Sequence, residues 1–393
     1  MLLYPVWKSG LIWARAGSHV ESALNKTVEE LCMELTRNQV EAQLASIQDR
    51  YLGQDLMTAK MVKELNLAGD QVTLKLVQGY PSGIYKTELQ AEIIEKLTQA
   101  GAAAVNVQID TVINAHAVQK TVKRHDGIKN IIAVASGKGG VGKSTTAVNL
   151  ALALLADGAK VGILDADIYG PSQPRMLGIS GQPVSEDGRS LQPMQNHGLK
   201  AMSIGFLIEE DTPMIWRGPM VTQALEQLLN DTKWGDLDYL IVDLPPGTGD
   251  IQLTLSQKIP VSGAIIVTTP QDIALLDARK GLKMFEKVEV PILGVVENMS
   301  MHVCSRCGQV EHIFGAGGGE AMAEQYKVTY LGGLPLDIQI RQQADSGKPT
   351  VVADPQGKVS GLYHEIARKA SARLARQSKD YSAKFPTIKI QNV

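Results

Sequence analysis

Residues 137–145 read Gly-Lys-Gly-Gly-Val-Gly-Lys-Ser-Thr and fit the pattern G-x-x-x-x-G-K-[ST]. Glycines in this pattern let backbone N–H groups close around a phosphate chain, so the stretch predicts a nucleotide-binding loop. Lys143 is expected to reach the β- and γ-phosphates, and the Ser144 hydroxyl is expected to bind Mg²⁺. The predicted phosphate-binding residues are Gly137, Lys138, Gly139, Gly140, Val141, Gly142, Lys143, Ser144 and Thr145.

Carboxylates follow two apolar runs further along the chain. Asp165 and Asp167 come after the run 161–164, and Asp243 comes directly after 239–242. A carboxylate at a strand end beside a phosphate loop can hold the shell of Mg²⁺, so Asp243 is predicted to order metal-bound water. Asp165 and Asp167 are candidates to orient the attacking water. A single aspartate after a strand would instead indicate a turn or a helix cap.

Cys304 and Cys307 form a C-x-x-C turn that can present two thiolates to one metal. Tetrahedral zinc and iron–sulfur clusters usually need four ligands. Cys32 is remote in sequence, and His302 and His312 are interpreted as hydrogen-bonded surface residues. Two copies of the pair, facing each other in a symmetric homodimer, would supply four thiolates and fit a bridging [4Fe–4S] cluster. A zinc site in the same dimer and a redox dithiol are the alternatives, the latter disfavoured because the pair does not open a helix.

Short apolar runs that alternate with helical stretches must position these motifs. Continuous apolar runs are typical of strands buried on both faces, so the sequence predicts an α/β fold with a mostly parallel sheet flanked by helices. Ligands of such sheets bind beyond the carboxyl ends of the strands, where the motifs lie. The phosphate loop precedes a predicted helix over 146–155, whose N-terminus favours an anion. The predicted strands are 131–135, 161–164, 239–242, 263–267, 292–296 and 329–332.

A small α+β domain is predicted before this sheet. Helical spacing runs from Leu44 to Leu65, alternating patterns predict strands over 71–77 and 104–110, and a helix is expected over 87–100. Residues 1–32 are predicted to be either a disordered extension or sequence before the true start at Met33. The small domain is predicted over 33–115 and a polar, basic linker over 116–130. The nucleotide-binding domain is predicted over 131–380, followed by a tail over 381–393.

Composition excludes several classes of function. The 393 residues include 39 Lys and Arg and 41 Asp and Glu, so no global charge favours nucleic acid or anionic lipid. Three cysteines are too few for a secreted disulfide framework and predict reduced thiols and a cytoplasmic location. No apolar run approaches the ~20 residues that cross a bilayer. Neither nucleic-acid binding nor stable membrane association is therefore expected.

The phosphate loop with its additional Lys138, the segment Asp165-Ala-Asp-Ile-Tyr-Gly-Pro-Ser and the segment Asp243-Leu-Pro-Pro-Gly-Thr-Gly-Asp resemble the deviant Walker A P-loop ATPases. That family includes septum-site and partitioning ATPases, the nitrogenase iron protein and the Mrp/ApbC cluster carriers. The resemblance implies a homodimer in which Lys138 reaches the partner's nucleotide and stabilises transition-state charge in trans. It also implies that Asn298, in Glu-Asn-Met-Ser after a late strand, recognises the adenine of ATP.

The cysteine turn and its surroundings resemble the Mrp/ApbC branch in particular. The resemblance implies an ATP-hydrolysing carrier that uses ATP, Mg²⁺ and a [4Fe–4S] cluster and passes the cluster from a donor scaffold to apoproteins. Residues 33–115 resemble the iron–sulfur-assembly domain of many such proteins, but Gly79-Tyr-Pro-Ser-Gly stands where that domain often has Cys-Pro, so a docking role is expected. The alternative is a partitioning or positioning ATPase of the septum-site type, which needs a terminal amphipathic helix. The apolar residues of 361–376 are instead expected to pack on the sheet, with the basic ones solvated.

Overall fold

The computed structural model describes residues 35–119, 122–208 and 218–380, so the predictions for 1–32 and 381–393, and Cys32, lie outside it. The chain divides into two compact units. One comprises Met1–Gln48, Asp55–Leu76 and Leu89–Gln108, and the other comprises Asp49–Gln54, Val77–Glu88 and Ile109–Val393.

The amino-terminal elements form an α+β arrangement. Helix α2 (Arg37–Ala45) begins at a capping box of Thr36 and Gln39. Strands β3 (Val62–Ala68), β4 (Gln71–Gln78) and β5 (Ala104–Thr111) form a three-stranded sheet, and helix α3 (Tyr85–Gln99) precedes β5. The strand predictions 71–77 and 104–110 and the helix 87–100 are confirmed to within two residues at each end.

The predicted helix from Leu44 to Leu65 is wrong. Helix α2 ends at Ala45, and β1 (Gln48–Asp49) and β2 (Gln54–Asp55) follow before β3. The carboxylate of Asp49 accepts from the N–H groups of Tyr51 and Leu52, and Asp55 accepts in the same way from Met57 and Thr58. Side-chain bonds of this kind compete with helical hydrogen bonds and produce turns.

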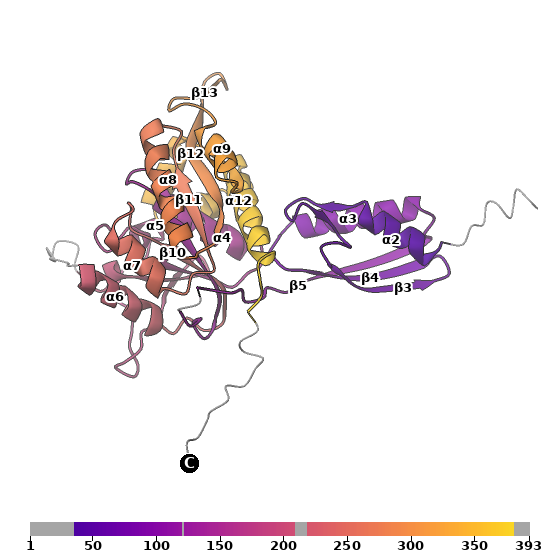
Figure 1. Ribbon diagram of the computed structural model, residues 1–393, viewed down its shortest axis with the longest axis horizontal. Coiled ribbons are helices and arrows are strands. Elements are labelled where there is room, and N and C mark those ends of the chain that lie inside the picture. The colour runs from indigo at the N-terminus through magenta and orange to yellow at the C-terminus, as the bar shows by residue number, and fades with distance from the viewer. Residues whose placement is uncertain (1–34, 120–121, 209–217, 381–393) are drawn as a thin grey trace, which may run out of the picture. The chain divides into compact units, whose positions relative to one another are not determined.

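The second unit is built on one sheet of nine strands, which confirms the predicted α/β class (Figure 1). The strand order is β13-β12-β11-β6-β10-β7-β9-β8, and β14 pairs with β12. Among the described pairings of this sheet, only β8 and β13 run antiparallel to their neighbours. The strands are β6 (Ile128–Ala135), β7 (Val161–Asp165), β8 (Met194–Asn196), β9 (Leu199–Ser203), β10 (Leu237–Asp243), β11 (Gly263–Thr268), β12 (Ile292–Val303), β13 (Val310–Glu311) and β14 (Tyr330–Pro335).

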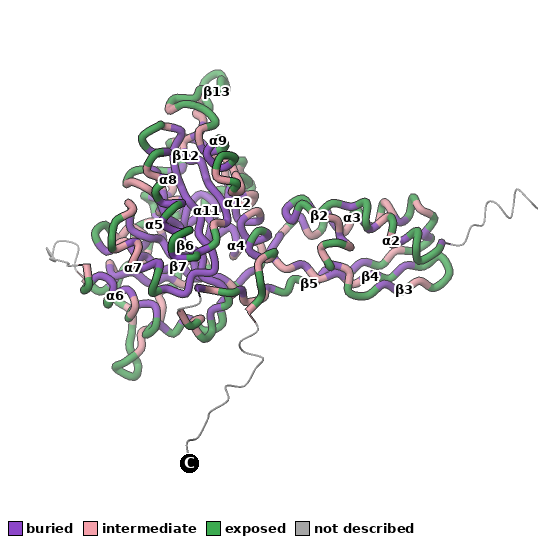
Figure 2. The backbone as a smooth tube through the Cα atoms, in the orientation of Figure 1, coloured by how far each residue is buried: buried purple, intermediate pink, exposed green. Residues whose placement is uncertain are grey.

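Helices flank this sheet and bury its central strands. Every residue of β7 and β11 is buried, as the continuous apolar runs predict. Figure 2 shows the buried backbone following the central strands. The helices are α4 (Lys143–Ala156), α5 (Gln173–Met176), α6 (Gly218–Asn230), α7 (Asp250–Lys258), α8 (Asp272–Lys287), α9 (Gly318–Gln325), α10 (Ile338–Asp345), α11 (Thr350–Ala353) and α12 (Lys358–Ala375), with a 3₁₀ turn at Ile204–Phe206.

Helix α12 packs against α4 and β14, as expected for a helix that covers the sheet. Ile366 and Leu374 are buried, whereas Leu362 is exposed. The expectation that all its basic residues are solvated is wrong for Arg368, which is buried and pairs with Asp157 at 2.6 Å. No helix in the described part of the chain combines the length and the apolar character needed to cross a membrane.

Candidate nucleotide and metal sites

The phosphate loop connects β6 to α4, as predicted. Gly142, with φ 80°, is the N-cap of α4 and has no side chain, so the first amides of the helix stay open to an anion. Helix α8 supports the loop from outside: a Cβ on Gly137 would lie 2.2 Å from the backbone carbon of Asp277. Only glycine fits at position 137, because the backbones of the phosphate loop and of α8 approach each other closely there.

Lys143 and Asp243 meet at the start of α4. Lys143 Nζ donates to Asp243 Oδ1 and to Ser144 Oγ, the latter at 3.1 Å. Lys143 is 6% exposed and Asp243 is fully buried. The structure thus brings together the residues predicted to bind the phosphates and to order metal-bound water. A buried lysine and carboxylate are stable only as a pair, so each holds the other in place.

Asp165 lies beside Asp243 because the strand register puts it there. The two residues are direct partners at the ends of β7 and β10, both fully buried. Asp165 Oδ2 accepts from the N–H groups of Ser172 and Gln173 at 3.0 Å and from Ser203 Oγ at 3.1 Å. Burial and, secondly, the Asp243 charge raise the pKa of Asp165 to about 7.

Asp167 is placed at the same edge of the sheet. It is half-buried, and its N–H donates to Asp165 Oδ1 at 3.2 Å. Burial raises the pKa of its carboxyl group, while the nearby Lys143 charge opposes that shift. The three predicted acidic residues therefore occupy one sheet edge next to the phosphate loop.

Gln173 belongs to this cluster and was missed from the sequence. Its Nε2 donates to Asp243 Oδ2 at 2.8 Å and to the Ser144 carbonyl at 3.1 Å. Its Oε1 is buried and has no hydrogen-bond partner among the described residues. Together with Ser144 Oγ and the carboxylates, this acceptor gives a set of oxygen atoms that fits Mg²⁺, which binds oxygen ligands in proteins. No motif in the sequence marks a glutamine two residues after a Gly-Pro pair.

Asn298 lies inside β12, not after a strand as predicted. Its Nδ2 donates to the Val141 carbonyl of the phosphate loop at 2.8 Å, and the residue is 8% exposed. The structure thus joins Asn298 to the predicted nucleotide site, and its contact with adenine stays a prediction. Lys138, in the same loop, is half-buried, and its action in trans stays a prediction too.

The cysteines occupy the turn of the β12–β13 hairpin. The turn is closed by hydrogen bonds from Cys304 N to Gln309 O and from Gly308 N to Cys304 O. Cys304 is half-buried and Cys307 is exposed. The N–H groups of Arg306 and Cys307, and then the Cys307 thiol, lower the pKa of Cys304, which favours the thiolate that binds metal.

One chain supplies only part of a metal site here. In the described ranges, no group of three or more His, Cys, Asp and Glu residues could hold a metal ion. The Nδ1 atoms of His302 and His312 contact the carbonyl oxygens of Leu336 and Ser300, at 2.9 and 2.8 Å. Both histidines are therefore hydrogen-bonded to backbone, as predicted. The two thiols fit half of a four-thiolate site.

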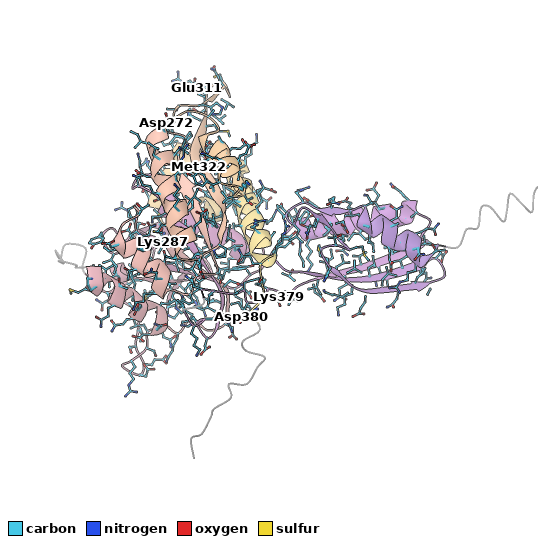
Figure 3. All side chains as sticks on the ribbon, viewed as in Figure 1. Asp272, Lys287, Glu311, Met322, Lys379 and Asp380 are labelled. Atoms are coloured by element: carbon cyan, nitrogen blue, oxygen red, sulfur yellow. The ribbon has the colours of Figure 1, made fainter. Side chains whose placement is uncertain are left out.

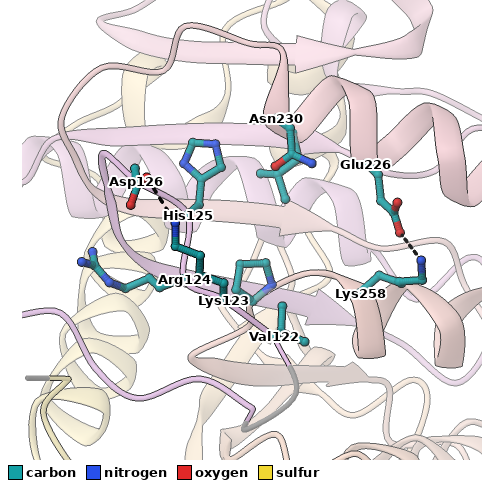
Figure 4. Close-up of a pocket in the computed structure, with 10 residues that line it drawn as sticks. Val122, Lys123, Arg124, His125, Asp126, Glu226, Asn230 and Lys258 are labelled. Carbon is teal, nitrogen blue, oxygen red and sulfur yellow. Dashed lines mark ion pairs between the residues drawn. The ribbon is translucent and has the colours of Figure 1, made fainter. Parts of the chain in front are cut away.

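A polar pocket opens at the other end of the central strands (Figure 4). Its charged side chains pair with one another: Lys123 lies 3.7 Å from Asp126, and Lys258 lies 3.0 Å from Glu226. Arg124 pairs with Asp380 at 3.0 Å. Among the described basic residues of the predicted linker, Lys123, Arg124 and Lys129 each have an acidic partner.

The raised pKa of Asp165 has a consequence for stability. Since its folded pKa is about 7 and its unfolded pKa is about 3.9, the native state binds the extra proton between these values. The contribution of Asp165 to the free energy of unfolding is fully present below about pH 4. It falls by up to about 1.4 kcal/mol per pH unit as the pH rises towards 7. Asp165→Asn should therefore raise the melting temperature relative to wild type by an amount that grows between about pH 4 and 7.

His116 and His125 have lowered pKa values through burial and change stability in the opposite sense, but they are the same in both proteins. Taking the difference between variant and wild type removes their contribution. A difference in melting temperature that does not depend on pH would mean that Asp165 stays ionised throughout this range.

Comparison with known proteins adds family relationships to this geometry. Residues 127–371 match the family described as NUBPL iron-transfer P-loop NTPase, and residues 37–109 match the family described as iron–sulfur cluster assembly protein. A solved nucleotide-binding protein from Archaeoglobus fulgidus, in complex with ADP, is 38% identical with a TM-score of 0.51. That similarity covers 59% of this chain and 90% of that one.

Curated relatives are similar over most of their length. The "Iron-sulfur cluster carrier protein" of Haemophilus influenzae is 53% identical over 344 residues, covering 86% of this chain and 92% of that protein. The protein of the same name from Escherichia coli strain K12 is 50% identical and covers 89% and 96%. The mouse "Iron-sulfur cluster transfer protein NUBPL" is 53% identical over 251 residues, covering 63% and 79%.

Proposed function

This chain belongs to the family of NUBPL iron-transfer P-loop NTPases, and we propose that it is an ATP-dependent iron–sulfur cluster carrier that holds a [4Fe–4S] cluster between two copies of itself. The carrier activity, ATP hydrolysis and the use of ATP, Mg²⁺ and a cluster follow from the family and from relatives at 50% identity or more over most of the chain. The dimeric site and the residue roles are our own proposals.

In the nucleotide site, we assign Lys143 to the phosphates, Ser144 to Mg²⁺ and Asp243 to metal-bound water. The loop residues 137–145 would bind the phosphate chain through their backbone. Asp165 and Asp167 would orient the attacking water, and Asn298 would contact adenine. The buried cluster of Lys143, Asp165 and Asp243 supports these roles because it puts one cation and two carboxylates next to the phosphate loop.

The observation that carries the dimeric cluster site is the pair of thiols on an exposed hairpin. A symmetric partner would add the two missing ligands. Three large apolar side chains of this hairpin are exposed, namely Val303, Val310 and Ile313, with exposed fractions of 49%, 51% and 54%. Clustered exposed apolar residues are typical of surfaces that bind another protein.

Because a carrier passes its cluster on, the recipients are apoproteins, which do not yet contain an iron–sulfur cluster. We propose a small docking domain within 33–115, a linker at 116–130 and an ATPase domain over 131–380, in a cytoplasmic protein. The match of 37–109 to an iron–sulfur assembly family supports a role of the first domain in meeting donors or recipients.

Anaerobic reconstitution with iron and sulfide tests the proposal. We expect broad visible absorption, four iron atoms per two chains and the mass of a dimer. A colourless protein that retains stoichiometric zinc would contradict it. A coloured protein with the mass of a monomer would contradict the shared site.

The proposed action of Lys138 across the dimer predicts complementation. Lys138→Ala and Lys143→Ala should each be inactive alone. In a mixture, the mixed dimer has one complete site, formed by Lys143 of one chain and Lys138 of the other. Equal mixing should restore about a quarter of wild-type ATP hydrolysis, since about half the dimers are mixed. No recovery after exchange of subunits would mean that Lys138 acts on its own nucleotide.

A further inference from the structure

The second half of strand β12 connects the phosphate loop to the cysteine turn. Midway along the strand, Asn298 Nδ2 donates to Val141 O at 2.8 Å, and six residues later the chain reaches Cys304. The contact with the loop is close, because a Cβ on Gly142 would lie 2.1 Å from Asn298 Nδ2. Since interiors are densely packed, a movement of the loop at residues 141–142 must displace this side chain.

The segment 298–300 is a bulge in β12. Met299 has φ 57°, in the left-handed region, and the pairing with β14 shifts between Glu297 and Met301. Ser300 is buried, and its hydroxyl donates to the Leu334 carbonyl at 3.1 Å. A left-handed non-glycine residue held by its surroundings is a local strain that a change in those surroundings can alter.

A hydrogen bond of His312 connects the segment that follows β13 to this bulge. Its Nδ1 lies 2.8 Å from the Ser300 carbonyl oxygen, so Nδ1 carries the proton and donates. His312 directly follows β13, whose partners on β12 are His302 and Val303. Glu311, the neighbour of His312, marks this end of the hairpin in Figure 3. The cysteine turn is therefore held on one side by β12 and on the other by His312.

We propose that His312 is a positioning residue through which the bulge 298–300 couples the phosphate loop to the cysteine turn. A nucleotide in the loop fixes the position of Val141, and this fixes the positions of Asn298 and the Ser300 carbonyl. Because His312 donates to that carbonyl, the turn with Cys304 and Cys307 becomes more ordered as well. The coupling is reciprocal, so metal in the turn changes nucleotide affinity by the same factor. A role of this coupling in cluster release rests on the proposed function. The coupling between the loop and the turn does not, because it involves only residues of this chain.

Thiol alkylation of the metal-free full chain tests this coupling. In a Cys32→Ala background, iodoacetamide reacts with Cys304 and Cys307, and rates are compared with and without Mg·ADP. We expect ADP to slow alkylation at least about fivefold, the lower end of typical couplings, because an ordered turn keeps Cys304 half-buried. Measurement at two protein concentrations separates this effect from association of chains.

Three variants decide the role of His312. His312→Ala, compared at saturating Mg·ADP, should reduce the effect of ADP to less than about twofold. Because the coupling is reciprocal, it should weaken ADP binding by no more than about fivefold. His312→Asn, whose amide nitrogen can replace Nδ1 as the donor, should restore the effect of ADP. His197→Ala is the matched control, because His197 bonds the Gly347 carbonyl at 2.8 Å elsewhere in the same unit.

An ADP effect of equal size in wild type and His312→Ala would overturn the proposal, as would no effect in wild type. Neither result bears on whether a cluster binds, because the assay contains no iron. Conversely, a reconstituted protein that stays colourless would reject the carrier and leave the coupling intact.

Discussion

Lys143→Ala is expected to lower the rate of ATP hydrolysis by at least about 100-fold, measured as steady-state phosphate release. Lys143 is the buried cation at the start of α4, where the predicted phosphate loop meets the helix N-terminus. In phosphoryl transfer the protein acts mainly by positioning and by stabilising charge on the transferred group. Unchanged turnover would remove the assignment of this nucleotide site.

The same substitution should also destabilise the fold, and this must be separated from catalysis. Without Lys143, Asp243 is a buried carboxylate beside Asp165 with no cation, at a cost of about 3–5 kcal/mol. Lys143→Gln keeps an N–H donor for Asp243 but removes the charge. It should recover part of the melting temperature and remain inactive.

Strand β10 offers a matched control for Lys143. At its opposite end, Lys129 pairs with Asp238 at 2.7 Å, but this lysine side chain is 46% exposed. Lys129→Ala should change stability by less than about 1 kcal/mol, as for exposed ion pairs, and leave ATP hydrolysis unchanged. Equal loss of activity in both variants would indicate damage to the sheet as a whole.

The parallel sheet could be predicted because burial on both faces leaves a direct mark in sequence. The apolar runs ending before Asp165 and Asp243 correspond to β7 and β10, and their register places the two carboxylates side by side. The order of strands in the sheet was not needed for this, since every parallel strand ends at the same edge. The main features of the candidate site follow from that geometry.

Polar strands and long-range side-chain contacts could not be predicted in this way. The segment 297–303 reads Glu-Asn-Met-Ser-Met-His-Val and looks like a turn, yet it continues β12 because β13 and β14 pair with it. Gln173 enters the site only through hydrogen bonds to residues 29 and 70 positions away. Such contacts depend on tertiary packing, which leaves no periodic pattern.

Cys304→Ala and Cys307→Ala are each expected to abolish the visible absorption that follows anaerobic reconstitution. In a symmetric dimer each substitution removes two of the four thiolates, so neither variant can retain a complete ligand set. ATP hydrolysis by the cluster-free protein should survive, because both cysteines lie outside the buried group of Lys143, Asp165 and Asp243.

Cys32→Ala is the matched control, since it makes the same chemical change at the third cysteine of the chain. It should bind the cluster at wild-type stoichiometry. If Cys32→Ala also lost the absorption, a single chain would be supplying a third ligand, and the requirement for a symmetric partner would weaken. If one hairpin variant kept a full complement of iron, the four-thiolate bridge would be wrong. Among the described residues, no group of three or more potential ligands could hold a metal ion, and the exposed hairpin carries two thiols. The dimeric site therefore requires that both hairpin variants lose the absorption and that the control keeps it.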